Sequence, residues 1–383
     1  MDAPKGRIGI TCYPTFGGSG ILATELGLEL ARRGWEVHFI SSRTPRRIAD
    51  YRERVFVHEV EPMRYPLFEH TPFALALAVK QAEVARGFDL DLLHVHYAIP
   101  HATSAWLAQQ MLDRRGLVRH LKILTTLHGT DITLVGQDPS YYDITRFSLE
   151  VSDGITAVSD YLTGETRRIF NLDAEIERIH NFVDTEEYVP DPPESPCREK
   201  MGFGDEKLML HVSNFREVKR IPDLMEIFLR VSRRMDSRLL LVGEGPELAR
   251  ALRFGRTHGL EDRVHAMGRV ESPACFLAMS DLLLLPSRSE SFGLVALEAL
   301  STATPVVASR VGGLPEVVSH GEDGYLEEAG DVDAMAARAL ELLGDERLLR
   351  AFGARGRERA VNSFSRDRIV DQYEAYYQRI LSG

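Results

Sequence analysis

Residues 282–298 read LLLLPSRSESFGLVALE and contain a strand, a loop and the start of a helix. The four leucines Leu282–Leu285 predict a buried strand, because a short, wholly apolar run bounded by turn residues is typical of a parallel sheet. A polar loop follows. From Gly293 onward, Leu294, Leu297 and Leu300 recur at helical spacing. A buried strand that leads through a polar loop into a helix is the repeating unit of α/β proteins.

The same unit recurs on both sides of the polar, proline-rich segment 191–196. We therefore predict an α/β fold with two Rossmann-like, parallel-sheet domains, at residues 1–188 and 189–364. The last segment, residues 365–383, is predicted to be a tyrosine-rich helix that packs back onto the first domain. The strands are expected at 7–12, 36–41, 55–59, 92–96, 122–126, 154–158 and 176–180, and then at 208–213, 238–242, 264–267, 282–285 and 305–308.

The composition excludes several classes of protein. The chain has 383 residues, with 46 Lys and Arg against 57 Asp and Glu, which gives a net charge of −11. This acidity argues against a general binder of nucleic acids or anionic membranes. Three widely spaced cysteines favour a reducing cytoplasm and no metal or redox motif. No apolar leader or membrane-spanning run is expected, so we predict a cytoplasmic protein without integral membrane association, and leave a homo-oligomer open.

Two glutamates eight residues apart point to a ligand site in the second domain. Glu290 lies in the predicted loop, and Glu298 lies on a largely apolar helix, where an unpaired carboxylate is costly to bury. A ribose diol would offer it two hydroxyl donors. The backbone N–H groups around Phe292, Gly293 and Leu294 would face a diphosphate at the helix N-terminus. The alternative is a solvated charge on a surface helix.

A cationic loop and a glycine turn follow two other strands of this domain. Arg216 and Lys219 lie just after the strand 208–213, at the strand end where open α/β sheets bind ligands. Both cations suit phosphate oxygens, although most charge runs are merely solvated. Gly243 and Gly245 follow the strand 238–242, and a plain turn with a helix cap explains them at least as well as a ligand.

The first domain has its own glycine-rich turn, at Gly17-Gly18-Ser19-Gly20. It predicts a phosphate or ligand contact at a helix N-terminus. Residues 18–23 also match G-x-G-x-x-A of dinucleotide-binding folds. However, residues 13–16 separate the strand from the glycines, and the second strand does not end in an acidic residue. A nicotinamide-dependent oxidoreductase therefore stays a remote alternative.

Histidines follow or end two further strands. His128 precedes Gly129 and Thr130, which makes a ligand pocket plausible, although lone histidines are more often structural. His94 and His96 alternate on one strand and face the same side. They lack an evident third ligand, so we expect no metal. Arg146, on a predicted helix, has the charge to meet an acidic acceptor.

Taken together, these motifs resemble the retaining glycosyltransferases of family 4, which have the GT-B fold with two domains that face a cleft. Glu290 to Glu298 resembles the E-x7-E element of that family, and Lys219, the turn 242–246 and Gly17-Gly18 match further elements. The resemblance covers essentially the whole chain. One position departs from the pattern: the family often has Arg where Asn214 stands, and Arg216 is the expected substitute.

Segments 9–14, 92–102 and 128–136 closely resemble one branch of this family. That branch transfers N-acetylglucosamine from UDP-GlcNAc to L-malate, with retention, in the first step of bacillithiol biosynthesis. The resemblance implies UDP-GlcNAc and L-malate as substrates, and no metal or other cofactor. By the same resemblance, the leaving phosphate takes the acceptor proton in a front-face attack.

The resemblance also implies roles for individual residues. Glu298 would hold the ribose hydroxyls, Arg216 and Lys219 would neutralise the diphosphate, and Glu290 and His128 would contact the sugar. His128, Glu290, Arg216 and Lys219 form the expected catalytic set. The full expected donor site comprises Gly17, Gly18, Arg216, Lys219, Glu290, Phe292, Gly293, Leu294 and Glu298.

L-Malate is a dianion with one hydroxyl, so its site should supply N–H groups and a cation. The expected acceptor site in the first domain comprises Ser19, Tyr97, Thr130 and Arg146. Three alternatives stay open at this point: a family-4 enzyme with another acceptor, such as inositol phosphate or a lipid-linked sugar; a UDP-GlcNAc 2-epimerase; and a sugar-nucleotide binding module without activity.

Overall fold

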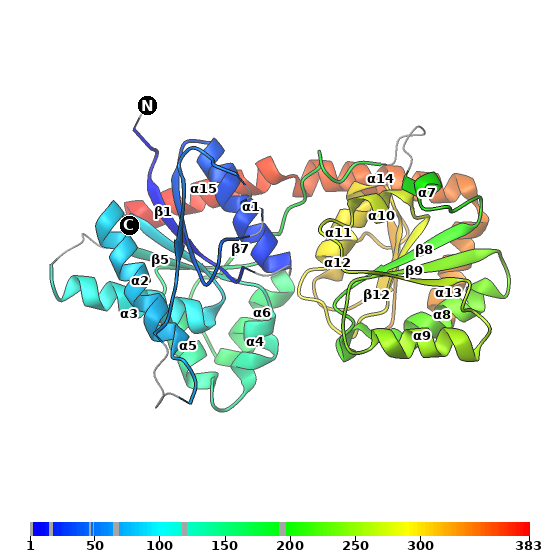
Figure 1. Cartoon of the computed structure of the whole chain (residues 1–383), viewed down its shortest axis with the longest axis horizontal. Coiled ribbons are helices and arrows are strands. Elements are labelled where there is room, and N and C mark those ends of the chain that lie inside the picture. The colour runs from blue at the N-terminus through cyan, green and yellow to red at the C-terminus, as the bar shows by residue number, and fades with distance from the viewer. Residues whose placement is uncertain are drawn as a thin grey trace. The chain divides into compact units, whose positions relative to one another are not determined.

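The computed structural model describes residues 3–14, 18–45, 47–48, 50–63, 69–116, 121–190 and 197–383. Gly17 lies outside this part of the chain, so its predicted role is not addressed. Two compact units are present: unit 1 comprises residues 1–181 and 367–383, and unit 2 comprises residues 182–366. Each is an α/β unit built on a parallel sheet, as Figure 1 shows for both.

Unit 1 contains a seven-stranded sheet in the order β3-β2-β1-β4-β5-β6-β7. Every adjacent pair is parallel. The inner strand β4 is buried at all five positions, as expected where helices cover both faces of a sheet. The strands are β1 (Arg7–Thr11), β2 (Glu36–Ser41), β3 (Val55–Glu59), β4 (Leu92–His96), β5 (Lys122–Leu127), β6 (Gly154–Ala157) and β7 (Glu177–Arg178).

The helices of unit 1 cover the two faces of this sheet. Ile40, Leu93 and Val95 face α2 and α3 in one core cluster, whereas Gly27 of α1 lies against Ile10 and Phe39 on the opposite face. The helical segments are α1 (Gly18–Arg32), α2 (Phe73–Phe88), a π-helical turn (Ala98–Ala102), α3 (Thr103–Asp113), α4 (Thr130–Thr133), a 3-10 turn (Val135–Gln137), α5 (Tyr142–Glu150) and α6 (Asp160–Phe170).

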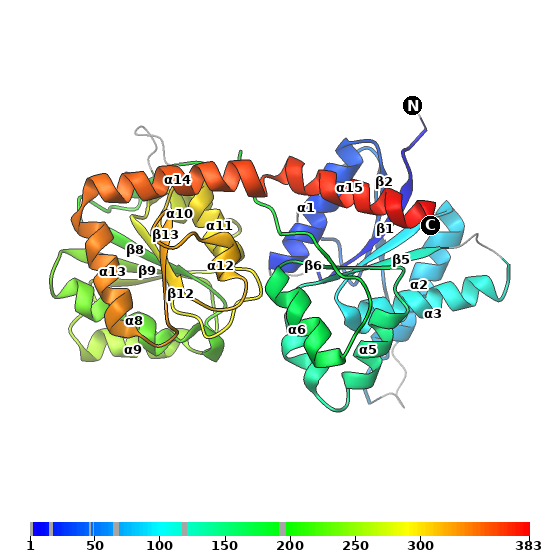
Figure 2. The same cartoon turned by 180° about the vertical axis from the view of Figure 1, so that it is seen from behind.

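The C-terminal helix α15 (Arg366–Ser382) packs on unit 1. Figure 2 shows it beside α1 and across the strands of that unit. The Tyr377 hydroxyl is 2.7 Å from Nδ1 of His94, and the Tyr377 ring meets Trp35 edge to face. Arg33 forms ion pairs with Asp371 at 2.5 Å and with Glu374 at 2.9 Å. Buried aromatic contacts and charges at the rim thus attach the last helix to the first sheet.

Unit 2 contains a six-stranded sheet in the order β10-β9-β8-β11-β12-β13. All its adjacent strands are parallel. The leucines of β11 are fully buried, which agrees with the strand expected there from sequence. The short final strand was not anticipated. The strands are β8 (Lys207–Val212), β9 (Ser237–Val242), β10 (Val264–Gly268), β11 (Leu282–Leu285), β12 (Val306–Ser309) and β13 (Gly324–Glu327).

The helices of unit 2 share an apolar core with its sheet, in which Phe228, Met335 and Phe352 are almost fully buried. The helical segments are α7 (Cys197–Lys200), a 3-10 turn (Glu217–Lys219), α8 (Ile221–Ser232), α9 (Leu248–Thr257), α10 (Ala274–Met279), α11 (Leu294–Ser301), α12 (Leu314–Val317), α13 (Val332–Gly344) and α14 (Glu346–Phe364).

The boundary between the units lies at residue 181 and not at the predicted residue 188. Backbone hydrogen bonds explain the difference. The Val183 N–H donates to the Phe364 carbonyl at 3.0 Å. The Tyr188 carbonyl accepts from Ser301 and from Arg357, both at 2.7 Å. Residues 182–188 are therefore held by unit 2, although they precede the proline-rich segment in sequence.

Two further features concern membrane-spanning helices and the cysteines. Among the described residues, no helix is both long and apolar enough to cross a membrane. Cys12 is a buried free thiol, but Cys275 is disulfide-bonded. Disulfides are rare in cytosolic proteins, so this bond was not anticipated from the low, widely spaced cysteine count.

Candidate active site

In unit 2, the loop between β11 and α11 presents Glu290 to a lysine from another loop. Lys219 ends the short 3-10 turn after β8, and its Nζ lies 2.5 Å from Oε1 of Glu290. The Ser287 hydroxyl donates to the same oxygen at 2.8 Å. The Lys219 and Glu290 side chains are 17% and 13% exposed. This half-buried ion pair joins two residues expected to hold different parts of the donor, one the diphosphate and the other the sugar.

Glycines hold the two loops in place. A Cβ atom on Gly243 would lie 2.0 Å from the Ser213 carbonyl oxygen, and one on Gly245 would lie 1.9 Å from that of Asn214. At Gly312, where φ is +56°, a Cβ would lie 1.8 Å from the Glu290 carbonyl oxygen. Only glycine permits such close backbone approaches. The glycine turn after β9 therefore supports the loop after β8, which is more than a helix cap alone requires.

A buried histidine on β8, His211, holds the loop that follows this strand through hydrogen bonds. Nδ1–H of His211 donates to the Leu284 carbonyl at 2.8 Å, which leaves Nε2 to accept from the Ser213 hydroxyl at 2.8 Å. The Ser213 oxygen in turn accepts from the Phe215 N–H at 3.1 Å. Burial lowers the pKa of His211 to about 4. This neutral histidine ties β11 to the cationic loop that carries Lys219.

The other donor residues predicted in unit 2 lie near Lys219 or Glu290 in the chain. They differ in how far they are buried. Arg216 and Asn214 are exposed on the same loop. Gly293, with φ at +97°, forms the N-terminal cap of α11, so Leu294 opens the helix as expected. Phe292 is only 3% exposed and packs against Phe364, so its side chain belongs to the core. Glu298 lies half-buried on α11.

In unit 1, the first turn of α1 meets the end of β4. The Ser19 and Tyr97 hydroxyls are 2.6 Å apart, which brings together two of the four predicted acceptor residues. Tyr97 has φ at +88°, and its N–H donates to the Thr126 carbonyl at 2.9 Å. Burial raises the pKa of Tyr97 to about 12, partly offset by the bond with Ser19. Gly18 is already the first residue of α1, so it does not lie in the tight pre-helical turn of a dinucleotide site.

His128 lies at the centre of a group of aromatic rings at the ends of β4 and β5. Its ring centroid is 5.2 Å from that of Tyr97 and 5.1 Å from that of His96. Its Nε2 is 2.8 Å from Nδ1 of His96. Burial lowers the pKa of His128 to about 3, so the ring is neutral at pH 7. His128 can therefore act as a neutral hydrogen-bonding group, not as a cation.

Asp131 lies beside these rings, within segment 128–136, and was not among the site residues predicted from sequence. Its carboxylate accepts from the N–H groups of Ala98 and Gly129, both at 3.1 Å. It is 3% exposed, and burial raises its pKa to about 6. In the sequence, the signal available for Asp131 was its place two residues after Gly129, just beyond the end of a strand. Asp131 fixes the backbone on either side of the ring cluster.

Thr130 and Arg146 are not joined to the Ser19–Tyr97 pair by any contact within the described part of the chain. Thr130 is exposed at the start of α4. Arg146 lies on α5 and donates from Nε to Glu150 Oε1 at 2.8 Å, with side-chain exposures of 42% and 46%. The cation expected to bind an acidic acceptor is thus paired within its own helix.

No group of three or more His, Cys, Asp or Glu residues in the described ranges is arranged to hold a metal ion. His94 and His96, considered as a metal pair from sequence, instead stack on each other with centroids 4.4 Å apart. Both nitrogens of His94 are used, at 2.7 Å from Tyr377 and at 2.7 Å from Thr126. His94 therefore belongs to the packing of unit 1, and His96 connects it to the ring of His128.

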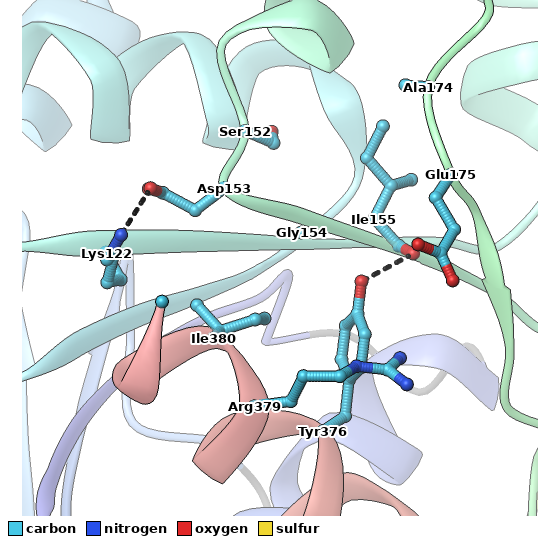
Figure 3. A pocket seen from close by; sticks show the side chains of 11 residues that line it. Lys122, Ser152, Asp153, Gly154, Ile155, Ala174, Glu175, Tyr376, Arg379 and Ile380 are labelled. Atoms are coloured by element: carbon cyan, nitrogen blue, oxygen red, sulfur yellow. Dashed lines mark hydrogen bonds and ion pairs between the residues drawn. The ribbon is translucent and has the colours of Figure 1, made fainter.

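A pocket of about 350 Å³ lies at the other end of the same strands, where β5 and β6 begin. Figure 3 shows Lys122 directed at Asp153, at 3.2 Å, and Tyr376 directed at the Ile155 carbonyl, at 3.4 Å. Arg379, also on the lining, pairs with Glu177 at 2.7 Å. Because Tyr376, Arg379 and Ile380 of α15 line this pocket and its two cations are held in ion pairs, we assign it to the packing of α15 on the sheet.

Comparisons with known proteins cover almost the whole chain. Residues 16–187 match the model of glycosyltransferase family 4, and residues 197–359 match that of glycosyl transferases group 1. The N-acetyl-alpha-D-glucosaminyl L-malate synthase of Bacillus anthracis is 46% identical over 378 residues, which is 98% of each chain. This chain belongs to glycosyltransferase family 4. The resemblance found in its sequence motifs is thereby confirmed.

More distant relatives of this glycosyltransferase show the same family and fold. A GDP-mannose-dependent alpha-(1-6)-phosphatidylinositol monomannoside mannosyltransferase of Mycolicibacterium smegmatis is 32% identical over 72% of this chain and 73% of its own. Sucrose-phosphate synthase from Thermosynechococcus elongatus superposes with a TM-score of 0.80 at 23% identity, over 99% of this chain and 100% of its own. Anabaena HepE, in complex with UDP and glucose, superposes with a TM-score of 0.80 at 19% identity, over 97% of this chain and 99% of its own. These structural likenesses confirm the GT-B fold.

Proposed function

We propose that this glycosyltransferase transfers N-acetylglucosamine from UDP-GlcNAc to the hydroxyl of L-malate, with retention at the anomeric carbon. The observation that carries the proposal is the 46% identity, over 98% of both chains, to the Bacillus anthracis N-acetyl-alpha-D-glucosaminyl L-malate synthase. The reaction is proposed to take place in the cytoplasm, as the first step of bacillithiol biosynthesis, and to need no metal or other cofactor.

The donor half of the proposal rests on unit 2. Lys219 and Arg216 are assigned to the diphosphate, Glu298 to the ribose hydroxyls and Glu290 to the sugar hydroxyls. The 2.5 Å ion pair supports this grouping, because it places a cation beside a hydrogen-bond acceptor in a half-buried loop cluster. A bound diphosphate would compete with Glu290 for Lys219 and leave the carboxylate to accept hydrogen bonds from the sugar.

The proposed step is a front-face displacement in which atoms and charges balance. The bond between the anomeric carbon and the diphosphate oxygen breaks, and the malate hydroxyl oxygen forms the new bond on the same face. The malate proton passes to the departing phosphate oxygen, so UDP leaves as the second product. Cations held near that oxygen favour the step, because negative charge develops there in the transition state.

The acceptor half rests on unit 1. Ser19 and Tyr97 supply hydroxyl groups, and Thr130 and Arg146 are retained as further candidates. The Tyr97 hydroxyl is protonated at pH 7, and burial raises its pKa further, to about 12, so it can donate a hydrogen bond to a malate carboxylate. His128 is assigned to the sugar on its 6-hydroxyl side, which its neutral ring suits better than binding a dianion.

Product identification tests the whole proposal. The protein is incubated with UDP-GlcNAc and L-malate, and the products are analysed by mass spectrometry, with the anomeric configuration read from proton NMR. The expected product is the α-glycoside of malate, formed together with UDP and unaffected by a chelator. UDP release without malate, or a β-glycoside, would contradict the proposal.

A different acceptor is the second candidate, because a mannosyltransferase acting on phosphatidylinositol monomannoside is 32% identical over most of this chain. Parallel incubations with inositol phosphate and with a lipid-linked sugar, each followed by UDP release, separate this candidate from malate transfer. Conversion of UDP-GlcNAc without any acceptor would instead indicate a 2-epimerase.

A further inference from the structure

The described part of the chain provides one hydrogen bond to the ring of His128, and it comes from His96. Nδ1 of His96 lies 2.8 Å from Nε2 of His128. One of these nitrogens must carry the proton and the other must accept it, since both rings are neutral at pH 7. The hydrogen bond therefore couples the protonation pattern of the two rings.

The remaining nitrogen of His96 decides between the two arrangements. Nε2 of His96 is buried and has no hydrogen-bond partner among the described residues, and the residue is 2% exposed. If Nε2 carried the proton, an N–H group would be buried without an acceptor. Orphaned buried N–H groups are rarer than unsatisfied acceptors. The less costly arrangement has the proton on Nδ1 of His96, which then donates to His128.

We propose that His96 is a positioning residue that sets the tautomer of His128. Nε2 of His128 accepts the hydrogen bond from His96, so the His128 proton resides on Nδ1. His128 then meets its ligand as an N–H donor, and not as a general base with a free lone pair. His96 itself touches no substrate in this scheme, and acts only through the ring of His128.

The surrounding rings hold His96 in the orientation that this scheme requires. The His96 ring stacks on that of His94, with centroids 4.4 Å apart at 29°, and meets that of His128 edge to edge, with centroids 5.1 Å apart at 25°. The His96 carbonyl accepts from Nδ1 of His101 at 2.5 Å. Stacking on one side and a backbone anchor on the other restrict rotation of the ring, so its Nδ1 stays directed at His128.

A donor at this position fits the proposed chemistry. In the front-face displacement, the leaving phosphate takes the acceptor proton, so no side-chain base is needed. An Nδ1–H on His128 would donate to a sugar hydroxyl. This part of the inference rests on the proposed function, but the tautomer of His128 is a property of the substrate-free protein and is measured without it.

The test is a two-bond proton–nitrogen correlation NMR spectrum of the full chain labelled with nitrogen-15 histidine, at pH 7. The chain has 13 histidines, and the His128 signals are assigned by their loss in His128→Asn. The expected result is a protonated Nδ1 and an unprotonated Nε2 on His128. A proton on Nε2 of His128 in the wild-type protein overturns the proposal.

Substitutions at His96 test whether the tautomer matters for activity. His96→Leu removes the donor and is expected to lower kcat/KM for UDP-GlcNAc by roughly tenfold or more, and to change the His128 tautomer pattern. His96→Asn places an amide N–H near the position of Nδ1, and is expected to restore both the Nδ1–H form of His128 and most of the activity.

His94→Leu is the matched control, because it removes the other stacked ring and leaves the His96–His128 hydrogen bond in place. It is expected to lower the Tm but to keep the His128 tautomer. If both leucine variants lose activity in proportion to Tm with the tautomer unchanged, His96 acts by packing alone and the proposal is wrong. If malate transfer fails for every protein, the proposed function is wrong, and the wild-type spectrum still decides the tautomer.

Discussion

The two candidate sites differ in how their polar groups are paired. In unit 2, a lysine and a glutamate form a half-buried ion pair, which a charged ligand can exchange for contacts of its own. In unit 1, neutral rings and hydroxyls surround His128, and the nearest carboxylate, Asp131, accepts from two backbone N–H groups. Unit 2 is therefore suited to bind a charged ligand. Unit 1 is suited to hold neutral hydrogen-bonding groups in a fixed orientation.

This contrast predicts that removal of the unit 2 cation has the largest effect. Lys219→Ala removes the charge assigned to the leaving diphosphate and leaves the Glu290 carboxylate without its cation. We expect kcat to fall by about 10²–10³-fold, as for the loss of other groups that stabilise transition-state charge. UDP release in the presence of malate measures this change.

Lys122→Ala is the control for that variant, because Lys122 is a lysine of similar exposure in an ion pair at the far end of the unit 1 sheet. Its kcat should stay close to that of the wild type. Equal losses in the two variants would show that the Lys219 effect does not arise from the donor site.

The next largest effect is expected at Glu298, which lies half-buried on α11. Glu298→Gln should weaken UDP binding by roughly tenfold or more, because an amide replaces one charged acceptor of the ribose hydroxyls with a donor. Calorimetry with UDP measures the affinity. Glu341→Gln, on α13, where the carboxylate binds Arg338 and Tyr325, serves as control. An unchanged Kd for Glu298→Gln would remove this residue from the donor site.

Asp131 gives a pH-dependent prediction for unit 1. Its pKa rises from 3.8 to about 6 on folding, so the folded state binds the proton more tightly than the unfolded state does. The free energy of unfolding should therefore fall as the pH rises from about 4 to about 6. This contribution is on the order of 3 kcal/mol and should be absent in Asp131→Asn.

Urea unfolding of the wild type and of Asp131→Asn, at pH 4 and at pH 7, measures this contribution. The wild-type loss of stability between the two pH values should exceed that of the variant. The same pH dependence in both proteins would mean that Asp131 is not the titrating group.

The smallest effect is expected at Arg146, whose guanidinium already pairs with Glu150. Arg146→Ala should raise the KM for malate by roughly fivefold, and should change the KM for UDP-GlcNAc far less. Its Tm should hardly move, since exposed ion pairs contribute little to stability. Arg168→Ala, in a similar surface pair with Glu165, is the control. Equal changes in both KM values would remove Arg146 from the acceptor site.

The two sites also differ in how readily they can be predicted from sequence, and the unit 2 site is the easier one. Most of the unit 2 site lies in short segments after strands, and one stretch, residues 282–298, holds both Glu290 and Glu298. Local spacing is therefore enough to predict its members. The ring contacts of His128 in unit 1 come from the end of another strand, and His96 lies 32 residues away in sequence. No local pattern predicts that pairing, or the bond that Asp131 makes with Ala98.

The sequence by itself determined the α/β class, the two-part division, the returning last helix and the family. These features can be predicted because each depends on a pattern within a short segment: an apolar run, a helical spacing or a motif at a strand end. The burial of apolar side chains favours the same local structure whatever the rest of the chain does. Tertiary structure alone decided the partners: Lys219 with Glu290, Arg146 with Glu150, and His96 with His128. Such pairing depends on which loops the sheet order brings together and on which polar atoms remain unsatisfied once the core has formed.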